Sequence, residues 1–167
     1  MKKGIFEEIK TYTPTSYEDF RGELYTSWNK KEFKNFFNND LEFIHDKVSV
    51  SRKNVLRGIH GDKKSWKYMS CVFGEVYYVV VDNRQASPTY MKWDWDVLSG
   101  KNKKFLLIPP GFGCAFFVLS ETSVVSYKWA YPGEYPDVND QFTIKWNDPR
   151  LNIMWPINNP ILQSRDR

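Results

Sequence analysis

The chain has 167 residues and a formal net charge of +4. It lacks the dense basic stripe of nucleic-acid-binding proteins, so we expect one domain without a nucleic-acid partner. Its two cysteines lie far apart, which excludes a disulfide framework and a cysteine-based zinc site. No apolar run is long enough to cross a bilayer and no apolar leader segment is visible, so we expect a cytoplasmic protein without a membrane anchor.

The predicted secondary structure is mostly β-strand. The first forty residues are mixed and polar, with one short helix predicted over residues 28–37. After them, runs rich in β-branched and aromatic residues alternate with proline and glycine turns. The predicted strands cover residues 48–51, 67–73, 76–82, 90–98, 105–108, 112–119, 123–129 and 142–146. This spacing favours one all-β sandwich or barrel over residues 1–167. No glycine-rich loop joins a strand to a helix, which disfavours a dinucleotide-binding fold.

Strand periodicity predicts the direction of two polar side chains. In the strand 123–129, Tyr127 shares a face with Val125 and Trp129, so it points inward if that apolar face is the interior. In the strand 67–73, Lys67 begins a face that is otherwise apolar. Periodicity alone favours a lysine that extends from the strand end into solvent.

Histidine is scarce in this sequence, with only His45 and His60. It is the side chain best suited to moving protons near neutral pH. His60 follows Arg57 by three residues, which suggests a site that binds an anion and moves a proton. The alternative from the residues alone is a hydrogen-bonded core histidine. Arg57 and His60 have opposite strand parity, so both face one pocket only if the strand has a bulge or bend at Gly58.

A series of short motifs resembles the dTDP-4-dehydrorhamnose 3,5-epimerase family. They occur in order over nearly the whole chain, and their combination carries more weight than any single one. The similar segments are Arg21-Gly22, Leu56-Arg57-Gly58-Ile59-His60, Gly74-Glu75-Val76, Val81-Asp82-Asn83-Arg84 with Ser87-Pro88-Thr89, Ile108-Pro109-Pro110-Gly111-Phe112, Val118-Leu119-Ser120, Tyr127-Lys128, Trp146-Asn147-Asp148-Pro149, Trp155-Pro156 and the C-terminal stretch 160–166.

The resemblance implies a cupin-type double-stranded β-helix, or jelly roll, with short peripheral helices. It implies a homodimer in which the N-terminal segment, about residues 1–40, contributes to the interface. The implied activity is a cofactor-independent isomerase that acts on a nucleotide-linked 4-keto sugar without a metal. The chain agrees with the last point, because a metal-binding cupin site is hard to build with two histidines.

The implied chemistry assigns roles to four residues. A 4-keto group acidifies the protons at C3 and C5, and epimerisation returns a proton to the opposite face through an enolate. By resemblance, His60 is the base and Asp166 the carboxylate that orients it, although a solvated tail carboxylate is an equal alternative for Asp166. Tyr127 is the acid on the opposite face. Lys67 lies near the C4 oxygen, where its charge stabilises the enolate.

The resemblance also implies residues that bind the diphosphate. Arg57 grips it, because a guanidinium meets phosphate oxygens in pairs. Arg21 reaches the same group from the neighbouring subunit. Ser51 adds a hydroxyl, although a serine in an alternating strand more often faces solvent.

One subgroup is closer, namely the epimerases of GDP-linked 4-keto-heptoses, which build modified heptoses for bacterial capsules. The similar segments are 43–47, 59–62, 127–131 and 140–143. His45, Lys47 and Asp62 replace residues that rhamnose-pathway enzymes typically place near the nucleotide or the sugar. These departures favour GDP over dTDP.

Two further departures leave the reacting carbon open. The family commonly has Asp at the position of Tyr78, and His or Asn at that of Cys114, both near the pocket. Activity at C3 alone therefore stands beside activity at C3 and C5. The leading hypothesis is an epimerase of a GDP-4-keto-(6-deoxy)-heptose. The alternatives are a dTDP-4-dehydro-6-deoxyhexose 3,5-epimerase, a ketoisomerase of the same fold, and a catalytically inactive cupin that binds a sugar nucleotide.

Overall fold

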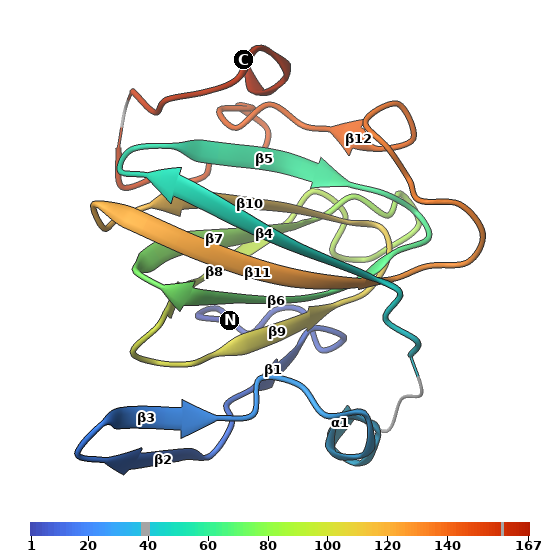
Figure 1. The fold of residues 1–167 in the computed structure, drawn as a ribbon. Helices are drawn as coiled ribbons and strands as arrows, with labels where there is room; N and C mark the ends of the chain where they lie inside the picture. The colour runs from blue at the N-terminus through green and yellow to red at the C-terminus, as the bar shows by residue number, and fades with distance from the viewer. Residues whose placement is uncertain (38–40, 158) are drawn as a thin grey trace.

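Two five-stranded antiparallel sheets pack face to face in a computed structural model, which describes residues 1–37, 41–157 and 159–167 (Figure 1). The first sheet has the order β1-β9-β6-β11-β4 and the second the order β12-β5-β10-β7-β8. A separate hairpin, β2–β3, and the helix α1 lie below the first sheet in this view. The architecture is a jelly roll of the cupin type, so the predicted all-β fold is confirmed.

The strands of the two sheets come from alternating parts of the chain. The first sheet consists of β1 (Lys10–Tyr12), β9 (Phe105–Ile108), β6 (Trp66–Phe73), β11 (Thr122–Ala130) and β4 (His45–Arg52). The second consists of β12 (Phe142–Thr143), β5 (Leu56–Gly61), β10 (Phe112–Val118), β7 (Glu75–Asp82) and β8 (Trp93–Ser99). The remaining elements are β2 (Ser16–Asp19), β3 (Gly22–Tyr25), α1 (Lys30–Phe37) and the C-terminal 3₁₀ turn η1 (Ser164–Asp166).

The main core fills the space between the sheets. Apolar side chains from both sheets meet there, among them Leu106 and Val125 from the first and Val80 and Phe112 from the second. The outer face of the second sheet is also covered, because apolar side chains between residues 144 and 162 pack against it. Both faces of β7 are therefore shielded from solvent. This explains why its residues 76–81 are apolar or aromatic at every position instead of alternating between apolar and polar.

The N-terminal region contains strands that the sequence did not predict. β1, β2 and β3 are short, and nearly all their residues are exposed, so they carry no buried alternation to reveal them. The predicted helix forms, but it begins at Lys30 because the side chain of Asn29 accepts hydrogen bonds from the amides of Lys31 and Glu32 (3.0 and 3.1 Å). Its one buried residue, Phe33, packs on the outer face of the first sheet.

Two predicted strands were too long. The strand predicted over 90–98 begins only at Trp93, because a turn built on Asp82 occupies the residues before it. The carboxylate of Asp82 accepts hydrogen bonds from Arg84 Nε (2.9 Å), Ser87 Oγ (2.6 Å) and Thr89 Oγ1 (2.6 Å). Burial alone raises the pKa of Asp82, but these donors outweigh it and lower the value to about 2. The strand predicted over 142–146 is confined to Phe142–Thr143.

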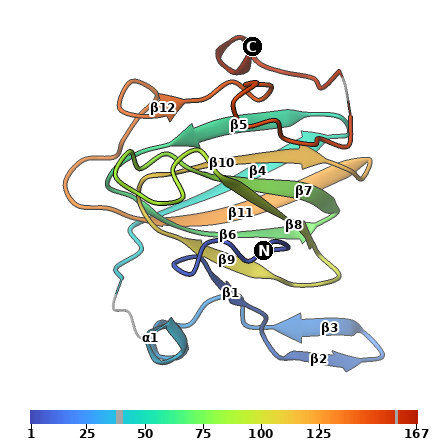
Figure 2. The same cartoon turned by 180° about the vertical axis from the view of Figure 1, so that it is seen from behind.

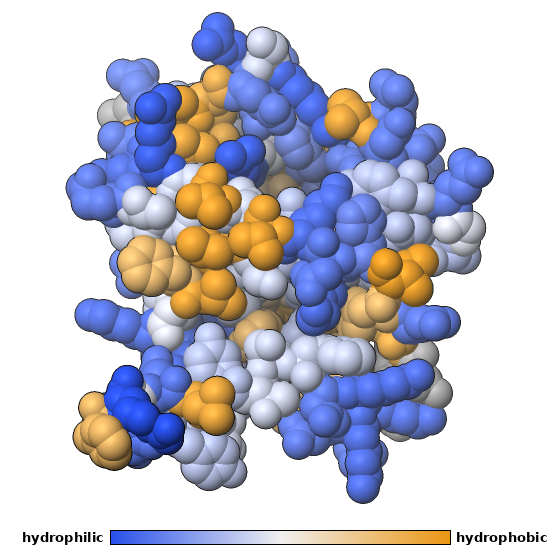
Figure 3. All heavy atoms as spheres, viewed as in Figure 1, coloured by the Kyte–Doolittle hydropathy of each residue, from blue (hydrophilic) through white to orange (hydrophobic). Residues whose placement is uncertain are grey.

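The edge strand β4 has an inverted polarity. Its inward side chains are polar, whereas Val48 and Val50 point outward and are each 64% exposed. Figure 3 shows apolar side chains gathered on this face, over β4 and β11. In the part of the chain that the structure describes, no helix is long and apolar enough to cross a membrane.

Candidate active site

A cavity of about 260 Å³ opens between the two sheets at the end that carries β12. The second sheet contributes His60, Arg57 and Cys114 to its lining, and the first contributes Lys67 and Tyr127. With Tyr78, which also lines it, six of the residues that the sequence singled out meet in one place, although they lie between positions 57 and 127 of the chain. His60 and Tyr127 approach from facing sheets, so a molecule bound between them has one on either side.

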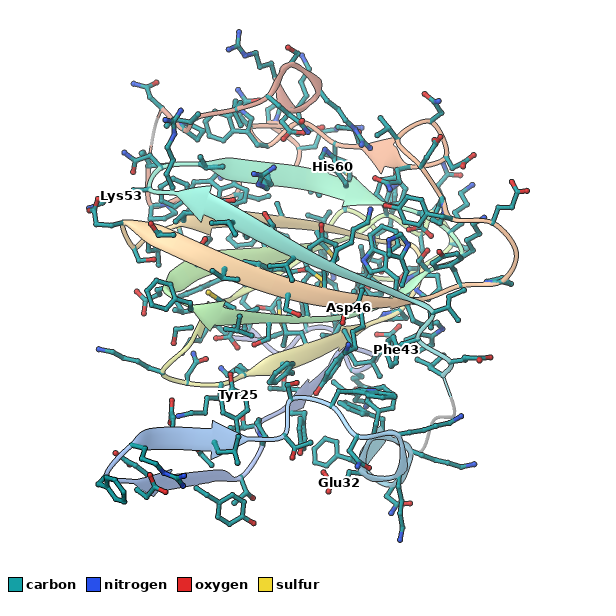
Figure 4. The ribbon with its side chains drawn as sticks, in the orientation of Figure 1. Tyr25, Glu32, Phe43, Asp46, Lys53 and His60 are labelled. Atoms are coloured by element: carbon teal, nitrogen blue, oxygen red, sulfur yellow. The ribbon has the colours of Figure 1, made fainter. Side chains whose placement is uncertain are left out.

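His60 and Asp166 form a closely held pair. His60 Nε2 lies 2.6 Å from Asp166 Oδ1, and the carboxylate is also 3.4 Å from the amide of Gly58. Asp166 is 1% exposed, so it is not a solvated tail carboxylate. Figure 4 labels His60 on β5, beneath the C-terminal turn that carries this aspartate. A buried carboxylate on one ring nitrogen fixes the imidazole tautomer and leaves the other nitrogen for the cavity.

A bulge at Gly58 explains how both Arg57 and His60 reach the cavity. Cys114 pairs with His60 and Phe116 pairs with Arg57, so β5 has one residue more than β10 across this interval. Gly58 has a φ of 110°, and a Cβ there would collide with the backbone of Cys114 and Ala115. The bend that strand parity required is confirmed, and only glycine fits it.

Lys67 is buried within the cavity wall, so the prediction of a solvent-extended lysine was wrong. Its residue is 6% exposed, and its Nζ lies 3.6 Å from Asp62 Oδ2 and 4.9 Å from the centre of the Trp129 ring. β6 begins at Trp66 and pairs with both β11 and β9 at Lys67, so this residue lies inside the sheet and its side chain lines the cavity beside Asp62 and Trp129. A buried ammonium beside one carboxylate and one aromatic face is available to a bound anion or enolate.

Tyr127 is half-buried and lines the same cavity. Burial raises its pKa above 10, while the nearby charge of Lys47 partly opposes the shift. The phenol is therefore protonated at neutral pH and has a proton to give. Its inward direction, predicted from strand parity, is confirmed.

Arg57 reaches over the mouth of the cavity. Its Nε donates to Ser51 Oγ (3.0 Å), and the guanidinium borders both this cavity and a neighbouring hollow of about 520 Å³ between β4, β5 and the C-terminal segment. Ser51 is 5% exposed and faces inward, not toward solvent. Serine and arginine together present donors to an anion at the entrance.

His45, Lys47 and Asp62 do not line the cavity directly. His45 Nδ1 lies 3.1 Å from the hydroxyl of Tyr131, and Lys47 hydrogen-bonds the hydroxyl of Tyr135. Asp62 is 3% exposed; its Oδ1 accepts from the amides of Lys64 and Ser65, and its Oδ2 faces Lys67. Its position supports the turn after β5 and holds Lys67.

Arg21 lies outside the cavity of its own chain. It occupies the turn of the β2–β3 hairpin, its side chain is 77% exposed, and it pairs with Asp19 (2.6 Å). The hairpin projects away from both sheets at the opposite end from β5 (Figures 1 and 2).

Several lining residues were missed by the sequence reasoning. Trp129 and Tyr135 form an aromatic wall, with ring centres 5.3 Å apart. Arg165 lies at the mouth, where its guanidinium donates to Thr143 Oγ1 (2.9 Å) and Gln141 Oε1 (3.3 Å). The aromatic spacing of residues 127–135 was the available signal for the wall. Nothing local marks Arg165, because the tertiary fold brings the C-terminus over β5.

Metal-ligating side chains are dispersed in this protein. Among residues 1–37, 41–157 and 159–167, no group of three or more His, Cys, Asp or Glu is arranged to hold a metal ion.

Comparison with known proteins agrees with this geometry. The family model described as dTDP-4-dehydrorhamnose 3,5-epimerase matches residues 4–167. The chain is 37% identical to the dTDP-4-dehydrorhamnose 3,5-epimerase of Shigella flexneri over 162 residues, covering 95% of this chain and 88% of the relative. It is 35% identical to the enzyme of the same name from Pseudomonas aeruginosa over 167 residues, covering 96% and 88%.

Two solved structures share the fold closely. The dTDP-6-deoxy-D-glucose-3,5-epimerase of Legionella pneumophila, in complex with dTDP-4-keto-L-rhamnose, has a TM-score of 0.89 and 35% identity over 97% of this chain and 86% of that one. A 3′-monoepimerase from Streptomyces bikiniensis, in complex with dTDP-quinovose, also has a TM-score of 0.89, with 29% identity over 97% and 82%. The chain belongs to the dTDP-4-dehydrorhamnose 3,5-epimerase family and is an isomerase of the epimerase type.

Proposed function

We propose that this protein epimerises C3 and C5 of a dTDP-linked 4-dehydro-6-deoxyhexose, without a cofactor. The observation that carries the proposal is the His60–Asp166 pair, 2.6 Å long, on one side of a cavity that Tyr127 lines from the facing sheet. A base and an acid on opposite sides of one bound ring are what inversion at a carbon requires.

The reaction follows from these positions. His60 takes the proton from the carbon beside the ketone; the C–H electron pair forms a C=C bond, and the carbonyl oxygen becomes an enolate. Lys67 stabilises that negative oxygen, and Asp62 and Trp129 hold the ammonium in place. Tyr127 then gives its proton to the opposite face, and the ketone re-forms. Solvent returns a proton to Tyr127 and removes one from His60.

The entrance of the cavity suits a diphosphate. Arg57 and Arg165 both border it, and Ser51 adds a hydroxyl through its contact with Arg57. Guanidinium groups recognise phosphate oxygens in pairs, so the diphosphate lies at the mouth and the sugar lies deeper, toward Lys67.

The sequence analysis ranked GDP above dTDP as the nucleotide of the substrate, and the present proposal reverses that order. The relatives named above are dTDP-sugar enzymes. The case for a GDP-linked 4-keto-heptose rested on His45, Lys47 and Asp62. Asp62 is buried behind Lys67, and only the other two flank the aromatic wall through Tyr131 and Tyr135. GDP is therefore the second candidate, favoured by that pair and by the segments that resemble the GDP-heptose enzymes. Titration calorimetry with dTDP and GDP in one buffer separates the candidates, and tighter GDP binding would restore the heptose assignment.

The polarity of β4 supports a homodimer. The edge strand β4 turns Val48 and Val50 outward, and the hairpin beyond the opposite edge of the first sheet exposes Tyr17 and Phe20; both surfaces are unsuited to water and suited to a second copy of the chain. A partner hairpin docked near this face would bring its Arg21 toward the cavity mouth, which is consistent with the N-terminal interface expected from the sequence.

The function is tested by deuterium exchange. Wild-type protein incubated with dTDP-4-dehydro-6-deoxyglucose in D₂O is expected to place deuterium at C3 and C5, read by mass spectrometry. His60→Asn is expected to abolish exchange at both carbons, because the described cavity lining contains no second imidazole. Exchange at C3 alone would assign a monoepimerase. Wild-type exchange rates in the His60→Asn variant would remove His60 from the mechanism.

A further inference from the structure

Tyr78 is a buried phenol that the mechanism above does not use. It lies on β7, is 0% exposed and contributes to the lining of the cavity between the sheets. Within the described parts of the chain, no oxygen or nitrogen atom accepts a hydrogen bond from its hydroxyl, and only the weakly accepting thiol of Cys114 lies beside it. Buried polar groups in proteins are nearly always well hydrogen-bonded, so a hydroxyl without a good acceptor at a cavity wall points to a ligand that supplies one.

The surroundings of Tyr78 determine what it can do. Burial raises its pKa well above 10, and the neighbouring Cys114 and Tyr127 add to that effect. The phenol is therefore neutral at any physiological pH and acts as a hydrogen-bond donor, not as a base. Cys114 is itself held as a thiol, since burial raises its pKa, and a thiol is a weak acceptor. An oxygen atom of a bound molecule is a far better partner.

We propose that the Tyr78 hydroxyl donates a hydrogen bond to an oxygen of the sugar and so fixes the rotation of the ring between His60 and Tyr127. The inference rests on the proposed function, and it deepens that function by naming a sugar-recognising residue. Tyr78 contacts the sugar and not the diphosphate because it is completely buried, whereas Arg57 at the mouth is exposed.

Tyr78→Phe isolates the hydroxyl, because it keeps the ring and the packing. Tyr77→Phe is the matched control: Tyr77 is the next residue of β7, points to the opposite face and stacks on Trp95 outside the cavity. The probes are dTDP and dTDP-glucose, which carries a sugar but no keto group and so is not turned over. If the wild-type protein prefers guanosine nucleotides, GDP and GDP-mannose replace them.

The expected result is a loss of affinity only for the ligand that carries a sugar. Tyr78→Phe should bind dTDP as the wild type does, and should bind dTDP-glucose roughly two- to tenfold more weakly, the effect of one hydrogen bond. Its ligand-free melting temperature should be equal to or above that of the wild type, since the buried hydroxyl that is removed has no acceptor better than the Cys114 thiol. Tyr77→Phe should leave both affinities unchanged.

Three outcomes overturn the inference. They are equal affinities of Tyr78→Phe and wild type for dTDP-glucose, an equal loss for dTDP and dTDP-glucose, and a lowered melting temperature, which would make the hydroxyl structural. Deuterium exchange in the same preparations keeps the two proposals separate. Wild-type protein that exchanges no deuterium defeats the proposed function, whereas a sugar-dependent loss in Tyr78→Phe still supports the contact.

Discussion

Burial decides what the charged residues of this site can do. Lys67 is 6% exposed with a single carboxylate 3.6 Å away, and Asp166 is 1% exposed with His60 at 2.6 Å. Coulomb interactions are several times stronger in such surroundings than in water, so each partner is held firmly and screened little. The same residues on an exposed strand would form weak surface pairs.

The role of Tyr127 is tested by Tyr127→Phe. Proton removal by His60 should continue, while protonation from the facing sheet should slow. General acid–base groups contribute roughly 10²–10⁴-fold, so formation of the epimerised product should fall by about that factor. The two half-reactions are separated by measuring product formation and, in parallel, the loss of deuterium from a substrate labelled at C3 and C5. An unchanged rate of product formation would exclude Tyr127 as the acid.

The pH profile gives a second check on the same residue. Because burial raises the pKa of Tyr127 above 10, the protonated form that acts as the acid persists to higher pH than for a free tyrosine. Activity should therefore show no alkaline decline from this group below about pH 10. A decline between pH 8 and 9 that disappears in the Tyr127→Phe variant would contradict this assignment of the proton.

At the scale of elements, β4 and β5 depart from regular strand rules at the site. β4 turns polar residues inward because its inner face flanks the cavity and the adjoining hollow, and β5 carries a bulge at Gly58 that re-aims Arg57 and His60. Bulges commonly occur beside active sites for this reason. A regular β5 would point one of these two residues away from the substrate.

Gly58→Ala tests the bulge. The added Cβ would meet Ala115 Cα and Cβ at 2.8 Å and collide with the carbonyl of Cys114, at a φ of 110°. We expect destabilisation of roughly 1–3 kcal/mol and, in the protein that still folds, displacement of His60 from Asp166 with loss of exchange activity. Chemical denaturation and the D₂O assay measure the two effects.

Gly22→Ala is the control for backbone strain alone. Gly22 has a φ of 124°, but a Cβ added there would have no neighbouring atom within 4 Å and would meet only open space. Gly58→Ala should destabilise the protein more than Gly22→Ala does. Equal losses would show that crowding by β10 contributes nothing.

At the scale of the whole molecule, the proposed dimer predicts that two variants, each inactive or weakened for a different reason, restore activity when they are mixed. Arg21→Ala alone should weaken substrate binding roughly tenfold to a hundredfold, because a charged contact to the diphosphate is lost. Mixing Arg21→Ala with the inactive His60→Asn variant should restore activity. In a mixed dimer, the site with an intact His60 receives Arg21 from the other chain.

The amount of restored activity is specific to this arrangement. After exchange of subunits at equal amounts, half of the dimers are mixed and each has one intact site, so about one quarter of wild-type activity is expected. If Arg21 binds substrate in the site of its own chain, the activity of the mixture should not exceed the summed activities of the two variants measured separately. A fully active monomer in sedimentation would contradict the proposed dimer.

The sequence alone determined the all-β class and the apolar strand face that Tyr127 shares. Both depend on local periodicity, and local signals of this kind are readable without a structure. The resemblance of the motifs supplied the rest: it put Arg57 and His60 at one pocket, which required a bend at Gly58, and it paired His60 with Asp166, which are 106 residues apart and share no local pattern.

Only the tertiary structure decided the rest. Lys67 is buried because β6 lies between β9 and β11. Asp62 lies beside Lys67 because the Asp62 carboxylate accepts hydrogen bonds from the amides of Lys64 and Ser65 and so fixes the turn after β5. The C-terminal segment places Arg165 at the mouth of the cavity and buries Asp166, although both residues belong to a polar tail in the sequence. Periodicity describes which face a residue takes, whereas burial and charge pairing depend on what the other strands place against that face.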